Sequence, residues 1–125
     1  MAVKRANKKS ATPAGRGVTF DTVCRLMSEL PGVEPGLSYG TPGFKVKGRF
    51  LSRLKEDGES LVLRIGFEER EALMESAPDV FYVTDHYLNY PAVLVRLPKV
   101  RKAALRRVLK HAWAEVAPES LKKKP

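Results

Sequence analysis

Two stretches of the chain carry apolar residues at helical spacing. The first contains Phe20, Val23, Leu26, Met27 and Leu30 and stops at Pro31-Gly32. The second begins at Lys99, and its apolar stripe contains Val100, Ala104, Leu105, Val108, Leu109, Ala112, Trp113 and Val116. A shorter pattern over residues 68–77 has acidic residues in its first turn and ends before Pro78. These patterns predict three helices.

Between the helices, side chains alternate as they do along strands. Lys47-Gly48 predicts a tight hairpin after an irregular entry at residues 38–43, because glycine readily takes a positive φ. Phe44 and Val46 would face inward before the turn, with Phe50 and Leu54 inward after it. Further strands are predicted over residues 60–66, 80–83 and 92–97.

Helices before and after a run of antiparallel strands predict an α+β fold in which the helices pack on one face of the sheet. The other face is then left to solvent. Strand parity places six basic side chains on that face, namely Lys45, Lys47, Arg49, Arg53, Arg64 and Arg96. Leu51, Val62 and Leu94 are expected to lie among them.

Charge is distributed unevenly along the 125 residues, whose net charge is +9. Residues 1–17 contain five basic and no acidic side chains, and residues 99–125 contain nine basic and two acidic ones. The stretch between them has nine basic and twelve acidic side chains. We therefore predict a disordered basic tail (1–17), one domain (18–121) and a frayed basic end (122–125).

The single cysteine, Cys24, excludes an internal disulfide, which fits a reducing cytoplasm. We expect this residue to be buried beside the first apolar stripe. No apolar run is long enough to span a bilayer, and the N-terminus lacks the apolar segment of a signal peptide. The prediction is a cytoplasmic monomer that does not bind membranes.

Three segments together resemble the bacterial MmcQ/YjbR family: LPGVEPGLSYGTPGFKVKGRFLSRL, VFYVTDHYLNYPAVLVRL and HAWAEVAPESL. The resemblance covers about residues 18–121. It implies a CyaY-like α+β fold, in which a curved antiparallel sheet is backed by helices. It also implies the family's label of DNA-binding protein, with a double-wing-like sheet. The basic extension before Val18 is not part of the resemblance.

The basic sheet face predicts nucleic-acid binding through phosphate contacts, with little sequence preference. Tyr39, Tyr87 and Tyr90 are candidates for stacking on bases. The alternative is a module that binds another protein through the sheet or the aromatic loop.

Catalysis and metal binding are not predicted. Asp85 and His86 are adjacent, but neighbouring residues on a strand point apart and no nucleophile is tied to them by spacing. His111 is the only other histidine and lies on the exposed side of the last helix. No glycine-rich phosphate loop is present, so we expect no cofactor and no enzymatic activity.

Overall fold

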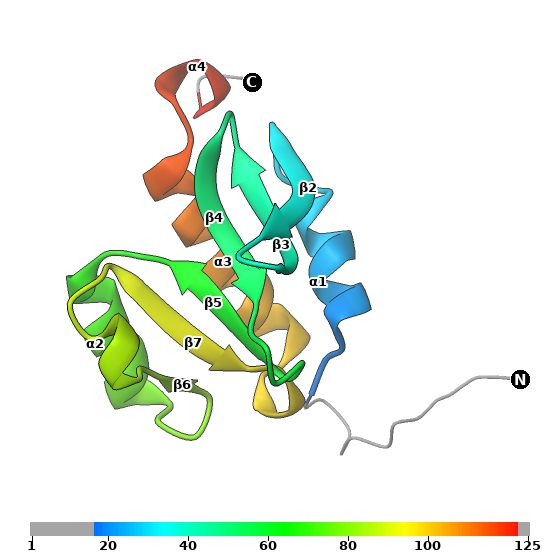
Figure 1. Ribbon diagram of the computed structural model, residues 1–125. Coiled ribbons are helices and arrows are strands. Elements are labelled where there is room, and N and C mark those ends of the chain that lie inside the picture. The colour runs from blue at the N-terminus through cyan, green and yellow to red at the C-terminus, as the bar shows by residue number, and fades with distance from the viewer. Residues whose placement is uncertain (1–16, 123–125) are drawn as a thin grey trace, which may run out of the picture.

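The computed structural model describes residues 17–122 (Figure 1). Most of the predicted disordered tail, residues 1–16, and residues 123–125 of the predicted frayed end lie outside the described residues. Gly17, assigned to the tail from the sequence, is joined to the domain: its N–H donates to the carbonyl of Val100, and that of Val18 donates to Leu97, both at 2.8 Å. Gly17 is therefore part of the folded unit.

One antiparallel sheet runs through the molecule in the strand order β2-β3-β4-β5-β7-β6. The strands are β2 (Val33–Ser38), β3 (Thr41–Val46), β4 (Arg49–Leu54), β5 (Ser60–Arg64), β6 (Phe81–Tyr82) and β7 (Ala92–Arg96). The α-helices are α1 (Phe20–Met27), α2 (Phe67–Ser76), α3 (Lys102–Val116) and α4 (Glu119–Lys122). Two short 3-10 helices complete the chain, η1 (Asp85–Tyr87) and η2 (Leu97–Lys99). The predicted α+β class is confirmed.

Two tight turns shape the first half of the sheet. Lys47 and Gly48 have φ angles of 50° and 82°, and Tyr39 and Gly40 have 54° and 83°. Positive φ at both central residues is the geometry of a type I′ hairpin turn. The Lys47-Gly48 turn, between β3 and β4, confirms the predicted hairpin. The Tyr39-Gly40 turn joins β2 to β3, so the irregular entry expected over residues 38–43 is this turn and the start of β3. The strand β2 was not predicted, because it contains proline and glycine, which an edge strand tolerates.

The helices cover one face of the sheet and form the main core with it. In Figure 1, α3 passes behind β4 and β5. Val23, Leu26 and Met27 of α1 meet this core, whereas Cys24 is exposed, which corrects the expectation that it is buried. The thiol lies one position away from the buried stripe. Partial burial, helped by Asp21, nevertheless raises the pKa of Cys24.

A β-bulge in β4 changes which side chains face the helices. Phe44 of β3 lies opposite Ser52, but the next residue, Lys45, lies opposite Phe50, so Leu51 is an extra residue. Leu51 and Ser52 both turn inward and are fully buried. Because the parity reverses at Leu51, Phe50 lies on the outer face, away from the helices, contrary to the predicted alternation.

The outer face has a small apolar cluster of its own. Val62, Ala92 and Leu94 are buried there, and Phe50, Tyr82 and Tyr87 pack against them. The expectation that Leu51, Val62 and Leu94 are exposed is therefore wrong. Leu51 faces the helices because of the bulge, and the other two are covered by aromatic side chains.

The C-terminal end also differs from its prediction. Residues 119–122 form the helical turn α4, so Lys122, assigned to the frayed end from the sequence, belongs to a helix. Leu121 packs against the main core and lies close to Gly32. A Cβ atom added at Gly32 would lie only 2.6 Å from Cδ1 of Leu121. Nζ of Lys122 donates to the carbonyl of Ala114.

Candidate nucleic-acid interface

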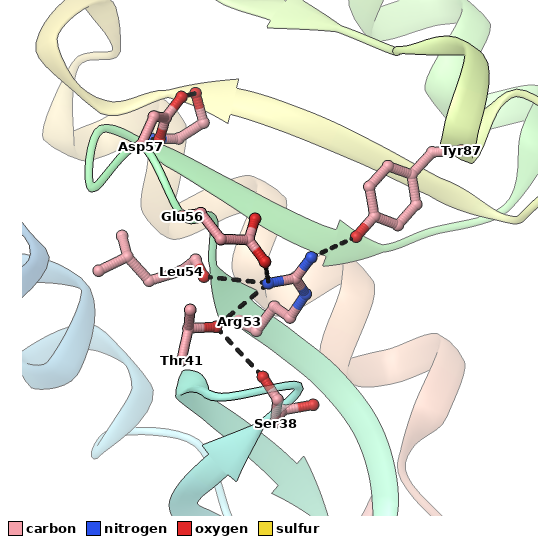
Figure 2. A network of polar contacts seen from close by, with 8 residues as sticks. Ser38, Thr41, Arg53, Leu54, Glu56, Asp57 and Tyr87 are labelled. Atoms are coloured by element: carbon pink, nitrogen blue, oxygen red, sulfur yellow. Dashed lines mark hydrogen bonds and ion pairs between the residues drawn. The ribbon is translucent and has the colours of Figure 1, made fainter.

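Arg53 is the centre of a polar network on the outer face (Figure 2). Its side chain is almost fully buried, and Nη2 donates a 2.7 Å hydrogen bond to the hydroxyl of Tyr87. Nη1 reaches the Thr41 hydroxyl, the Leu54 carbonyl and the Glu56 carboxylate at 3.2, 3.4 and 3.2 Å. Burial alone would lower the pKa of Arg53, but the bonds to Tyr87 and Glu56 outweigh it and raise this pKa. The guanidinium of Arg53 is therefore used for hydrogen bonds within the protein.

Arg49 and Arg96 are also engaged within the protein. The bulge places Arg49 opposite Val46 on the helix-covered side, where Nη1 donates to the carbonyl of Val116 at the end of α3. Arg96 lies on the outer face, with its guanidinium carbon 4.0 Å from the ring centroid of Tyr82. Arg49 is therefore not on the predicted surface, and Arg53 and Arg96 are on it but have protein partners.

The other three predicted cations are exposed and unpaired. Within residues 17–122, no hydrogen bond or ion pair engages the side chains of Lys45, Lys47 or Arg64. Lys45 and Arg64 share the outer face, two strands apart, which is roughly 10 Å at the usual strand spacing. Lys47 lies in the adjoining turn. Glu34 is the cross-strand neighbour of Lys45 and partly offsets its charge.

An aromatic loop lies next to these cations. We call its three rings, those of His86, Tyr87 and Tyr90, the aromatic ledge. The ring of Tyr87 meets that of His86 edge-on at 4.7 Å, and the rings of His86 and Tyr90 are 6.4 Å apart. Tyr90 is 60% exposed, whereas Tyr87 is half-buried with its hydroxyl bound to Arg53. Of the predicted stacking residues, Tyr90 has a free ring surface and Tyr87 serves mainly as a support.

Tyr39, the third predicted stacking residue, lies in the β2–β3 turn and is 84% exposed. Its ring centroid is 5.5 Å from the guanidinium carbon of Arg53. It therefore borders the outer face but does not belong to the aromatic ledge.

Arg70 is a residue of this region that the sequence did not single out. It extends from α2, is 3% exposed, and donates to the carbonyls of Tyr87, Leu88, Tyr90 and Ala92 at 3.0–3.2 Å. Its position among the glutamates of α2 gives no local signal of burial. No local pattern reports that its guanidinium holds a loop about twenty residues away.

Asp57 organises the opposite end of the outer face. Its carboxylate accepts hydrogen bonds from the N–H groups of Glu59 and Ser60 and from the Ser60 hydroxyl, which also bonds to Tyr82. Burial alone would raise the pKa of Asp57, but these hydrogen bonds outweigh it and lower that pKa. These hydrogen bonds stabilise the turn before β5 and the first residue of that strand.

No metal centre is formed by the described part of the chain, where no three histidine, cysteine or acidic side chains come together. His111 is exposed, as predicted, and bonds to Glu115 at 2.9 Å. Asp85 and His86 lie in η1 and not on a strand. Among residues 17–122, no helix is long and apolar enough to cross a membrane.

The architecture is that of a known α+β domain. It matches the crystal structure of Deinococcus radiodurans protein DR2400, a DUF419 domain, with a TM-score of 0.69 over 90% of this chain and 87% of that chain. The identity of 22% makes this a likeness of fold alone. The YjbR family profile matches residues 28–115, and the chain belongs to the YjbR family. This confirms the resemblance drawn from the three segments.

Relatives of known sequence occur in mycobacteria. The uncharacterized proteins Mb2600 of Mycobacterium bovis and Rv2570 of Mycobacterium tuberculosis are each 40% identical to this chain over 118 residues. The match covers 82% of this chain and 92% of each relative.

Proposed function

We propose that this protein binds nucleic acid, DNA in the first place, with little sequence preference and without catalysing a reaction. The observation that carries the proposal is the group of unpaired cations at Lys45, Lys47 and Arg64, which we call the free cation group. They lie on or beside the outer sheet face, which no α-helix of residues 17–122 covers. Each cation that neutralises a phosphate releases counterions and so favours binding.

Low sequence preference follows from the kind of contacts that this surface offers. Lysine and arginine side chains on a sheet reach phosphates, which position a ligand but do not report its sequence. Readout in the major groove usually requires a helix or ribbon that enters it. The basic residues of 1–17 and of α3 would add attraction at long range.

The test compares two charge-reversal variants with the parent. One carries Lys45→Glu, Lys47→Glu and Arg64→Glu. The control carries Lys102→Glu, Arg107→Glu and Lys110→Glu, three exposed cations of α3, so its net charge changes equally. Fluorescence anisotropy with labelled duplex DNA is expected to show a much larger loss of affinity for the first variant. Equal losses would show that only net charge matters.

A shortened chain that begins at Gly17 separates the contribution of the tail. We expect it to bind more weakly than the full chain at low salt and still to depend on the free cation group. If removing residues 1–16 abolishes binding and the sheet variant matches the parent, the tail carries the activity and the sheet face does not.

A second candidate function is recognition of another protein. Leu37 and Tyr39, 75% and 84% exposed, project from the β2–β3 hairpin. Next to them an apolar groove of about 400 Å³ runs between α1 and this hairpin, lined in part by Phe20, Met27 and Phe44. If no variant or parent binds nucleic acid at moderate salt, this surface becomes the better candidate. A partner captured by the parent and lost on Leu37→Ser would support it.

A further inference from the structure

Two buried arginines fix the aromatic ledge from both sides. Arg70 binds the backbone carbonyls of residues 87, 88, 90 and 92, and Arg53 binds the hydroxyl of Tyr87. A buried guanidinium is costly unless it is well hydrogen-bonded, so such residues are a demanding way to hold a surface loop. The consequence is that the backbone of this loop and the ring of Tyr87 are held in a defined position, from which the exposed rings of His86 and Tyr90 project.

The exposed rings of His86 and Tyr90 are separated by slightly less than a planar ligand between them requires. The ring centroids of His86 and Tyr90 are 6.4 Å apart and their planes differ by 33°. Stacked bases are spaced about 3.4 Å apart, so one base between two rings needs a separation of about 7 Å. A small rotation and outward movement of the exposed Tyr90 ring would make the two rings parallel and supply the difference. Tyr87 meets the ring of His86 edge-on and supports it from one side.

A cation for the adjoining phosphate lies at the same end of the sheet. Arg64 is paired in the sheet with Ala92, which follows Tyr90 by two residues. Its side chain is on the outer face, exposed, and without a partner among residues 17–122. A base between the rings and a phosphate on Arg64 are the two contacts that binders of single strands combine.

From this geometry we infer that the aromatic ledge holds one unstacked base between His86 and Tyr90, and that the preferred ligand is therefore single-stranded nucleic acid. This inference rests on the proposed function and names the substrate class of that surface. In a duplex each base is already stacked and paired, and taking it out costs a few kcal/mol. A single strand avoids most of that cost.

The experiment uses the full chain with two probes, a short labelled oligothymidine and a labelled duplex of equal length, at the same salt concentration. The parent is expected to bind the single strand about tenfold more tightly or better. His86→Ala and Tyr90→Ala should each weaken single-strand binding about tenfold and leave duplex binding within about twofold. Tyr90→Phe, which keeps the ring, should bind as the parent does.

Leu88→Ala is the matched control, because Leu88 is in the same loop and 49% exposed but has no ring. It should leave both affinities unchanged. A second readout follows stacking directly: an adenine analogue whose fluorescence is quenched by stacking, placed in the single strand, should be quenched by the parent and by Leu88→Ala but less by Tyr90→Ala. Circular dichroism of each variant verifies that it is folded.

The outcomes separate the two claims. If His86→Ala and Tyr90→Ala bind the single strand as tightly as the parent, or the parent binds both probes equally, the inference is wrong. If charge reversal of the free cation group still causes a much larger loss of affinity than the α3 control in that case, the proposed function stands without the inference. If neither probe binds the parent, both fail.

Discussion

The hydroxyl of Tyr87 accepts a 2.7 Å hydrogen bond from Nη2 of Arg53, a residue 34 positions earlier in the chain (Figure 2). This bond joins β4 to the loop between β6 and β7 across the outer face. It explains why the cluster of Val62, Ala92 and Leu94 is covered and why an arginine on a sheet face is almost fully buried.

Tyr87→Phe removes this bond and keeps the ring. We expect the free energy of unfolding to fall by roughly 1.5–3 kcal/mol, because a buried guanidinium loses a hydrogen-bond partner. Urea denaturation measures the change. Tyr39→Phe is the control, since the Tyr39 hydroxyl has no hydrogen bond within residues 17–122, and it should be neutral. Equal stability of the two variants would contradict the structural role of the bond.

Gly43 should not tolerate a side chain, whereas its cross-strand neighbour Gly36 should. A Cβ at Gly43 would lie 2.7 Å from the carbonyl oxygen of Ser52 and 3.1 Å from the Cβ of Arg53, while one at Gly36 would meet nothing within 4 Å. Gly43→Ala is expected to cost about 1–3 kcal/mol, the usual range for overpacking. Gly36→Ala should be close to neutral. Thermal unfolding of the two variants distinguishes these expectations.

The bulge predicts different roles for two arginines of the sheet. Arg64→Ala should reduce the slope of log affinity against log salt for duplex DNA by about 1, the value for one lost phosphate contact. Arg49→Ala should leave that slope unchanged and lower stability instead, because Arg49 binds the end of α3. Salt titrations of both variants measure this. A loss of slope with Arg49→Ala would place this side chain on the binding surface.

Acid should destabilise the protein partly through Asp57. Because hydrogen bonds lower the folded-state pKa of this carboxylate, its contribution is fully present above the unfolded-state pKa and is lost as the pH falls through the folded value. This loss of stability is expected below about pH 4, which is the ordinary pKa of an aspartate side chain. Asp57→Asn should flatten the decline of stability in that range. Parallel curves for the parent and this variant would show that the carboxylate contributes nothing.

Local pattern was sufficient for most of the fold. The apolar stripes of α1 and α3, the Lys47-Gly48 turn and the alternation in β5 predict their elements because each depends on neighbours in sequence. The edge strand β2 was missed because Pro35 and Gly36 disfavour a strand locally. It forms because its pairing with β3 outweighs this local preference. Tertiary pairing overrode local propensity there.

The candidate site was harder to predict because it depends on contacts between distant segments. The extra residue Leu51 is defined only by the pairing of β3 with β4, and this single residue moves Arg49 and Phe50 to faces opposite to those expected. The hydrogen bonds of Arg53 and Arg70 likewise depend on a loop far along the chain. Sequence alone could name the cations of the sheet but not which of them are free.

The most direct test of the central claim is the salt dependence of duplex binding by the triple variant Lys45→Gln, Lys47→Gln and Arg64→Gln. If each of these cations neutralises one phosphate, the log–log slope should be smaller in magnitude than that of the parent by about 2.7. Lys102→Gln, Arg107→Gln and Lys110→Gln together should change it much less. A slope for the first variant equal to that of the parent would contradict the assignment of the outer sheet face as the binding surface.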